Sequence, residues 1–224
     1  MYDTIIIIPY RDREQHLDIF LKNSLQHFLK YMPNFKLVII EQDKEKQFNR
    51  GKLLNIVFSI YKNKTKFFIT HDVDICPKEH VVKSIYLEKM YDVTRISVPH
   101  KRSFGQICKF SHDSIFSVNG FPNYIWGWGI EDRALYYRYN IMKKTISPNY
   151  SYESNFVFLH HKSNKENYSG EKKKISILED QIYECGDINR QKNHIMASGI
   201  NNVSYTIINK QEINDYVEWI TVSI

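Results

Sequence analysis

Thr4-Ile-Ile-Ile-Ile-Pro9 decides the fold, because five consecutive β-branched residues stop abruptly at a proline. Such a run is typical of a strand that is buried on both faces of a parallel sheet. The polar stretch 9–14 ends it, and apolar residues at helical spacing continue to Tyr31. The chain therefore begins with a predicted strand and a predicted helix.

The same alternation continues to residue 70. Strands are predicted at Phe35–Ile40 and Phe67–Thr70, with an amphipathic helix at 50–62 between them. This order predicts an α/β fold with a central, mainly parallel sheet flanked by helices. Ligands bind such sheets beyond the carboxyl ends of the strands. Polar residues follow all three strand ends, which indicates a functional rim there.

Beyond residue 95 the predicted elements are shorter. They comprise strands, a turn rich in Gly and Trp, helices and one polar stretch: strands at 95–98, 107–110 and 114–118, the turn at 121–129, a helix at about 131–143, an apolar run at 156–159, the polar stretch 162–174, a helix at 175–184, and strands near 203–208 and 219–224. No internal repeat and no linker separates domains.

The composition excludes several classes of protein. With 42% hydrophobic and 14% aromatic residues among 224, the chain can fill a core, which excludes a disordered protein. No apolar run reaches the roughly 18–20 residues of a membrane span. The early first strand leaves no room for a secretory signal, so we expect none. Cys76, Cys108 and Cys185 are odd in number and widely spaced, which favours a reducing cytoplasm.

The net charge of +6 and a pI near 9.0 indicate an anionic partner. A phosphate-bearing substrate, an acidic membrane surface and a nucleic acid all fit that description. Nucleic acid is the least favoured, because Lys and Arg are scattered and the densest run, Lys172–Lys174, has no interleaved aromatic residue.

Two segments carry groups that bind divalent cations. Asp72 and Asp74 follow the third strand, where two carboxylates can hold a hard cation against a diphosphate. His160 and His161 follow the run 156–159, and a neutral imidazole is a good partner to a carboxylate for Mn²⁺ or Zn²⁺. Both patterns also have structural interpretations, as a solvated turn that caps the next helix and as histidines with structural partners.

Trp126-Gly-Trp-Gly-Ile-Glu-Asp132 is the most unusual segment. Glycines on both sides of Trp128 let the indole move, and its ring offers a platform of the kind on which sugars stack. Glu131 and Asp132 open the next helix, a position that the helix dipole favours for acids in any protein. A carboxylate fixed beside an aromatic platform is also well placed as a general base toward a sugar hydroxyl.

Basic and aromatic residues near the strand ends can bind a nucleotide. Arg11 and Arg13 follow the first strand, and Phe48 and Arg50 lie at the start of the second helix. Arginine binds phosphate through its planar fork and Phe48 can stack on a base, although surface ion pairs and core packing also explain such residues. The polar stretch 162–174 is typical of a mobile basic loop, either an inert surface run or a lid over an anionic ligand.

Together these segments resemble the β-1,4-galactosyltransferase family. The resembling pieces occur in the order of the family, from Ile5 to the C-terminus: IIIIPYRDREQHL, FNRGKLLNIVF, FFITHDVDICP, SFGQI, NGFPNYIWGWGIED, LHHK and GINNVSYTI. The resemblance implies a GT-A-type, Rossmann-like fold. It also implies an inverting transfer of galactose from UDP-galactose to a sugar hydroxyl of a glycan, in a β-1,4 linkage, with Mn²⁺ or another divalent cation.

The resemblance further implies one catalytic domain over 1–224, with a nucleotide-sugar-binding part at 1–95 and an acceptor-binding part at 96–224 that includes a lid at about 162–174. Asp132 would be the catalytic base and Glu131 its sugar-binding neighbour. Asp74 and His161 would bind the metal. A larger set would bind the nucleotide sugar: Pro9, Tyr10, Arg11, Arg13, Phe48, Arg50, Asp72, Val73, Lys101, Gly105 and Trp128.

The chain departs from the family at several positions. Phe158 stands where the family has a methionine as its third metal ligand, so the identity and affinity of the metal stay open. Ser103 replaces a tyrosine of the animal enzymes, and the space that this leaves makes UDP-GalNAc an alternative donor. Arg133 interrupts the acidic run after Asp132. The acceptor-binding segment beyond His161 has no clear match.

The anchor, stem and disulfides of the animal enzymes have no counterpart in the chain. We therefore expect a short, soluble, cytoplasmic member of the family that acts on a glycan or a lipid-linked oligosaccharide. Its positive charge suits peripheral contact with an acidic membrane, on the inner face. A non-catalytic UDP-sugar-binding protein is the alternative from another class, since a fold does not fix a function.

Overall fold

The computed structural model describes residues 1–127, 129–160 and 170–224. Within them, most strands join one sheet: β1 (Tyr2–Tyr10), β2 (Phe35–Gln42), β3 (Thr65–His71), β5 (Val93–Ser97), β6 (Ile107–Ser111), β7 (Ile146–Asn149), β9 (Thr206–Asn214) and β10 (Val217–Ser223). Their order across the sheet is β7-β5-β6-β3-β1-β2-β10-β9. β4 (Ile75–Pro77) and β8 (Phe156–Phe158) form a separate antiparallel pair.

The middle of the sheet is parallel. β1 pairs in parallel with β2 and β3, and β10 pairs in parallel with β2. β6 runs antiparallel between β3 and β5, and β9 runs antiparallel to β10 at the edge. The predicted α/β fold with a mainly parallel sheet is confirmed, and the β-branched run of β1 lies at its centre.

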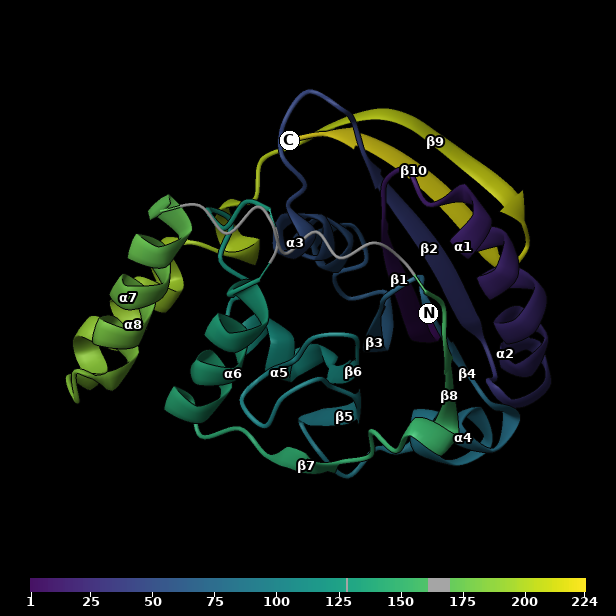
Figure 1. Ribbon diagram of the computed structural model, residues 1–224, viewed down its shortest axis with the longest axis horizontal. Helices are drawn as coiled ribbons and strands as arrows, with labels where there is room; N and C mark the ends of the chain where they lie inside the picture. Colours follow the sequence, from purple (N-terminus) through teal and green to yellow (C-terminus); the bar gives the residue numbers. More distant parts are fainter. Residues whose placement is uncertain (128, 161–169) are drawn as a thin grey trace.

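Helices cover both faces of this sheet (Figure 1). They are α1 (Glu14–Phe20), α2 (Gln26–Tyr31), α3 (Arg50–Ile60), α4 (Glu79–Ser84), α5 (His112–Ser117), α6 (Glu131–Ile141), α7 (Gly170–Glu184) and α8 (Ile188–Ala197). α1, α2 and α4 contribute to one core, and α3, α5 and α6 to the other. α7 and α8 pack beside α6, at the opposite end of the molecule from α1 and α2 (Figure 1).

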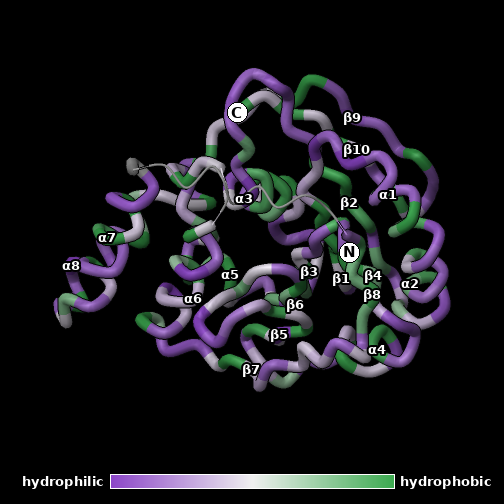
Figure 2. The backbone as a smooth tube through the Cα atoms, viewed as in Figure 1, coloured by the Kyte–Doolittle hydropathy of each residue, from purple (hydrophilic) through white to green (hydrophobic). Residues whose placement is uncertain are grey.

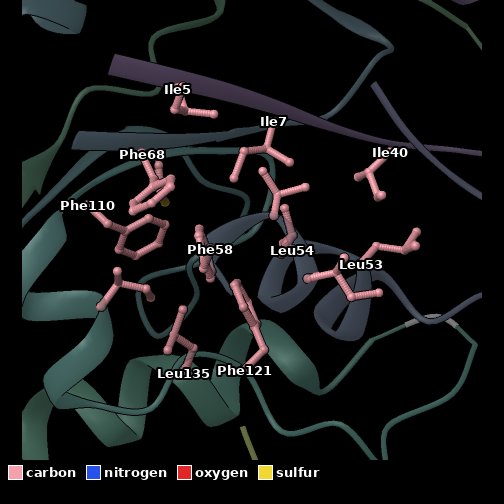
Figure 3. Packing of buried hydrophobic residues seen from close by; sticks show 14 of the residues in the cluster. Ile5, Ile7, Ile40, Leu53, Leu54, Phe58, Phe68, Phe110, Phe121 and Leu135 are labelled. Atoms are coloured by element: carbon pink, nitrogen blue, oxygen red, sulfur yellow. The ribbon is translucent and has the colours of Figure 1, made fainter. Parts of the chain in front are cut away.

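β1 supplies both cores, because successive side chains of a strand point to opposite faces. Ile5 and Ile7 lie in the core of α3, and Ile6 and Ile8 lie in the core of α1. Figure 3 shows Ile5 and Ile7 above the aromatic ring of Phe68 and the side chains of α3. In Figure 2 the hydrophobic stretches follow β2 and α3, whereas α8 at the margin is largely hydrophilic.

Local capping explains where the structure differs from the predicted elements. The strand predicted at 114–118 is wrong, because this segment belongs to the helix α5. Ser111 caps that helix by accepting a hydrogen bond from the amide of Ser114, and Ile115 fills the core. The single helix predicted up to Tyr31 is continuous, with a π-helical turn at Leu21–Leu25 between α1 and α2.

The C-terminal part holds further differences. α7 begins at Gly170, so the last residues of the stretch predicted as a polar loop are helical, whereas 161–169 lie outside the described residues. α8 was not predicted; its cap is Asp187, which accepts hydrogen bonds from two amides of the first turn. β9 begins at Thr206 rather than near residue 203. Among the helices of the described ranges, none has the length and apolar character needed to cross a membrane.

Candidate active site

The carboxyl ends of β1, β2 and β3 lie at one edge of the sheet, because these strands are parallel. β6 runs the other way and therefore brings its first residues to the same edge. There Ile107 pairs with His71, and the amide of Asp72 donates to the carbonyl of Gln106 at 3.1 Å. The sheet topology thus gathers the polar strand ends that the sequence indicates as a functional rim.

Arg50 is the centre of this edge. Its Nε donates to Oδ1 of Asp72 at 3.0 Å, and its Nη1 donates to Oδ1 of Asp132 at 2.9 Å. The Arg50 side chain is only 12% exposed. Burial disfavours its charge, but the two carboxylates more than offset this and raise the pKa of Arg50 above its ordinary value. One guanidinium therefore joins the end of β3 to the start of α6.

Asn49 fixes the position of Arg50. Its side chain caps α3 by accepting a hydrogen bond from the amide of Lys52 at 2.8 Å. Its own amide donates to Oε1 of Gln42 at the end of β2, and its Nδ2 donates to the carbonyl of Asn123. Asn49 was not among the predicted residues, although an Asn just before an amphipathic segment is a recognisable helix-start signal.

Glu131 and Asp132 form a buried acid pair at the start of α6. Glu131 is 5% exposed, and its Oε2 has no hydrogen-bond partner in the described part of the chain. Burial, followed by the charge of Asp132, raises the pKa of Glu131 to about 8, against the opposing effect of Arg50. Burial also raises the pKa of Asp132. Because Arg50 contacts Asp132 directly, the negative charge of the pair resides on Asp132.

Gly105 makes room for this acid. A Cβ atom at position 105 would lie 2.6 Å from Oδ2 of Asp132, which is closer than side chains approach. The amide of Phe104 donates to the carbonyl of Asp132 at 3.3 Å, and Oγ of Ser103 accepts from the amide of Gly105 at 3.0 Å. The segment 103–105 therefore lies against the acid pair.

Arg11 and Phe48 meet although they follow different strands. The Arg11 guanidinium carbon lies 5.2 Å from the centre of the Phe48 ring, and Nη1 of Arg11 donates to the carbonyl of Lys46 at 2.8 Å. The carbonyl of Phe48 accepts from the amide of Gly127 at 2.7 Å, which joins this pair to the segment that leads into α6. The predicted platform residue, Trp128, lies outside the described residues.

His71 supports the Asp72–Asp74 turn through a hydrogen bond to its main chain. Nδ1 of this buried imidazole donates to the carbonyl of Asp72 at 2.9 Å, so Nε2 accepts from the Tyr86 hydroxyl at 2.8 Å. Burial lowers the pKa of His71 to about 4, which keeps the ring neutral. This supporting pair was also missed, since the sequence carries no local signal for a contact between residues 71 and 86.

The pairing of β4 with β8 brings Asp74 next to the histidine-containing segment. Ile75 pairs with Phe158, and the amide of Leu159 donates to the carbonyl of Asp74 at 2.7 Å. His160 follows directly. The predicted ligand His161 lies outside the described residues, and among those described no group of three or more His, Cys, Asp or Glu side chains could hold a metal ion.

The remaining predicted residues lie in the core or at the surface near this edge. Pro9 is buried, and Tyr10 is 3% exposed with its ring edge-on to Trp219 at 5.1 Å. Val73 is also buried in the core of α1. Arg13 precedes α1 as its N-cap without a side-chain capping bond, and Lys101 is an exposed loop residue whose carbonyl accepts a hydrogen bond from Arg95.

Comparisons with known proteins identify what the chain is similar to. The model for the N-terminal region of glycosyl transferase group 7 matches residues 1–86, and the model for the N-terminal domain of galactosyltransferase matches residues 87–162. Human β-1,4-galactosyltransferase 4 is 32% identical over 171 residues, which cover 72% of this chain and 49% of that protein. Bovine β-1,4-galactosyltransferase 1 is 27% identical over 227 residues, which cover 98% of this chain and 54% of that protein. The chain thus spans about half the length of these curated relatives.

Solved structures support the fold. A mutant of Drosophila β-1,4-galactosyltransferase 7 in complex with manganese, UDP-Gal and xylobiose has a TM-score of 0.80 at 18% identity, covering 100% of this chain and 94% of that one. Staphylococcus aureus TarS in complex with UDP-GlcNAc has a TM-score of 0.57 at 12% identity, covering 87% of this chain and 70% of that one. The expected GT-A-type, Rossmann-like fold is confirmed.

The buried acid pair makes stability depend on pH. Folding raises the pKa of Glu131 from 4.5 to about 8. The free energy of unfolding therefore falls as the pH rises through that range, because the carboxyl ionises more readily in the unfolded chain. Glu131→Gln should therefore unfold several degrees above the wild type at pH 8.5, at roughly 2–4 °C per kcal/mol, and this gap should narrow toward pH 5. Thermal unfolding followed by circular dichroism measures it. An identical gap at both pH values would contradict the burial argument.

Proposed function

Because the chain belongs to the β-1,4-galactosyltransferase family, we propose that it is a metal-dependent, inverting glycosyltransferase that moves galactose from UDP-galactose to a hydroxyl of a glycan acceptor. The observation that carries the proposal is the junction of Asp72, Arg50 and Asp132 at the carboxyl edge of the sheet. At this junction the guanidinium of Arg50 bonds both to Asp72, at the end of the third strand, and to Asp132, the candidate base.

Asp132 is the proposed base. An inverting transfer needs a hydroxyl nucleophile aligned opposite the departing UDP, with its proton removed as the new bond forms. Asp132 carries the negative charge of the acid pair, and Arg50 holds its Oδ1 in a fixed direction. The second oxygen, Oδ2, lies so close to Gly105 that a Cβ atom there would be 2.6 Å away, so the glycine is what lets the carboxylate take this position.

Glu131 is the proposed sugar-binding neighbour. Its buried Oε2 has no partner in the described part of the chain, and a buried polar atom of that kind needs a hydrogen bond from a ligand. A sugar hydroxyl can supply it. A non-catalytic UDP-sugar-binding protein would need no buried acid pair beside Arg50, which favours the enzyme over that alternative.

The donor would lie toward β1 and α3. Arg11 lies over the Phe48 ring, a pair that suits a uridine, and Pro9, Tyr10 and Val73 lie at or just after the carboxyl ends of β1 and β3. We propose Asp74 and His161 as the residues that hold Mn²⁺ or another divalent cation, because a carboxylate with an imidazole is a suitable donor set and β4 brings Asp74 to the histidine-containing segment. When bound, the cation would offset the charge of the diphosphate leaving group.

The acceptor and the location stay proposals. A glycan or a lipid-linked oligosaccharide, a β-1,4 linkage, a cytoplasmic location and peripheral contact with an acidic membrane are predictions from the sequence. The division of the chain at residue 95 into two parts is likewise a prediction. The donor alternative, UDP-GalNAc, is favoured by one observation: Ser103 is a small side chain that lies against Gly105 beside the acid pair.

Asp132→Asn tests the base. The substitution keeps the size and the contact with Arg50 but cannot accept a proton, so we expect kcat to fall roughly 100- to 10,000-fold with UDP affinity kept. UDP release from UDP-galactose measures turnover, and calorimetry measures UDP binding. Asp113→Asn, at a fully exposed carboxyl, is the matched control. Normal turnover by Asp132→Asn with an inactive Glu131→Gln would reverse the two roles, and two active variants would refute the mechanism.

Asp74→Ala tests the metal site. Because Asp74 lies at the rim and outside both cores, the variant should fold normally but lose Mn²⁺-dependent UDP binding and turnover. Titration of Mn²⁺ in the presence of UDP, followed by the manganese EPR signal, measures the affinity. Since Phe158 cannot coordinate, we expect weaker binding in the wild type than a three-ligand site gives. Full activity of the wild type in excess EDTA would rule out a metal requirement.

Ser103→Tyr tests the donor. If Ser103 lies near C2 of the donor sugar, an added ring fills the volume of an acetamido group, so turnover of UDP-GalNAc should fall far more than turnover of UDP-galactose. The ratio of kcat/KM for the two donors is the measurement. Ser103→Ala, which adds no volume, should leave that ratio nearly unchanged. An equal loss for both donors would place Ser103 away from the sugar.

A further inference from the structure

α7 packs against the start of α6 through a polar face. Arg133, next to the candidate base, donates from Nη2 to Oγ of Ser176 at 2.5 Å and pairs with Asp180 at 3.3 Å. One turn away, Glu179 accepts hydrogen bonds from the hydroxyl of Tyr124 and from His194. The partners on α7 lie at helical spacing, so one face of this helix contacts the segment 124–133.

Lys172 lies on the same face, one turn before Ser176. It is 5% exposed, whereas its neighbours Lys173 and Lys174 point to solvent. Its Nζ lies 3.1 Å, and its Cε 3.3 Å, from the position that a Cβ atom would take at Gly127. One lysine of a run that is otherwise solvated is therefore inserted beside the active-site segment.

The charge of Lys172 acts on Glu131. Three charged groups act on that carboxyl electrostatically: Asp132 from α6, Arg50 from α3 and Lys172 from α7. Asp132 raises the pKa of Glu131, and the two cations lower it. Arg50 is already engaged by Asp72 and Asp132. In return, the charge of Glu131 raises the pKa of Lys172, against the effect of burial.

We propose that Lys172 is a positioning residue of the active site, which places a desolvated positive charge against Gly127, on the segment that leads into the acid pair, and so sets the pH range in which the carboxylate of Glu131 is ionised and available to the acceptor sugar. This inference rests on the proposed function in one respect, the role of Glu131 toward the sugar. The placement of the charge itself rests on α7 alone. It also gives a specific role to one residue of the stretch 162–174, which the sequence predicts as a lid.

Lys172→Met tests the proposal through a pH profile. Without the ammonium, the acid limb of kcat/KM should move to higher pH, by roughly one unit, because ionisation of Glu131 loses the attraction of a partly desolvated cation. Lys172→Arg should restore the limb. Lys173→Met, at the exposed neighbour, is the matched control and should leave it unchanged. A uniform loss of rate with an unmoved limb would show a structural role only and would overturn the proposal.

A direct titration separates this proposal from the proposed function. The ¹³C signal of the Glu131 side-chain carboxyl, assigned through Glu131→Gln, gives its ionisation in the free protein without any substrate. We expect ionisation at higher pH in Lys172→Met than in the wild type. Identical titration would overturn the proposal even in an active enzyme, and a shifted titration would support it even if UDP-galactose were not the donor. If Lys172→Met does not fold, Lys172→Gln takes its place in both measurements.

Discussion

The buried guanidinium of Arg50 is the interaction on which the site depends. It lies where the end of β3, the start of α3 and the start of α6 meet, and it bonds to a carboxylate from two of these elements. A buried charge is tolerated only when it is paired. The three elements therefore cannot separate without leaving a charged side chain exposed or unpaired. Arg50 therefore acts as a structural pin, and the same contact orients Asp132.

The burial of Glu131 and Asp132 beside Arg50 lowers the stability of the folded chain. Glu131 and Asp132 are adjacent, buried and raised in pKa, and Gly105 lets the chain approach them closely. A folded domain gains nothing from such a pair, because neutral residues would pack there without the desolvation penalty. Perturbed acids at the ligand edge of a sheet are what a site for proton transfer requires.

Features that depend on local pattern could be predicted, and features that depend on distant contacts could not. The run at Thr4–Pro9 predicts a central strand because burial on both faces leaves a continuous apolar signature. Phe48, Arg50 and Asp72 could be predicted as candidate site residues from motifs, yet the bond from Arg50 to Asp132 spans 82 residues and has no local signal. α5 was mistaken for a strand because a short apolar run has no distinct period, and its serine cap decided the outcome.

The strand order also has a consequence for how the chain folds. β2, from the first part of the sequence, is bordered on one side by β1 and on the other by β10, so Leu37 pairs with Ile6 on one side and with the distant Val217 on the other. Pairings so distant in sequence raise the contact order and slow folding. During synthesis on the ribosome, β1, β2 and β3 emerge early. One edge of β2 then has unpaired backbone groups until β10 has been synthesised. That edge is a template for pairing with other chains, so nascent or C-terminally clipped molecules are the ones exposed to aggregation.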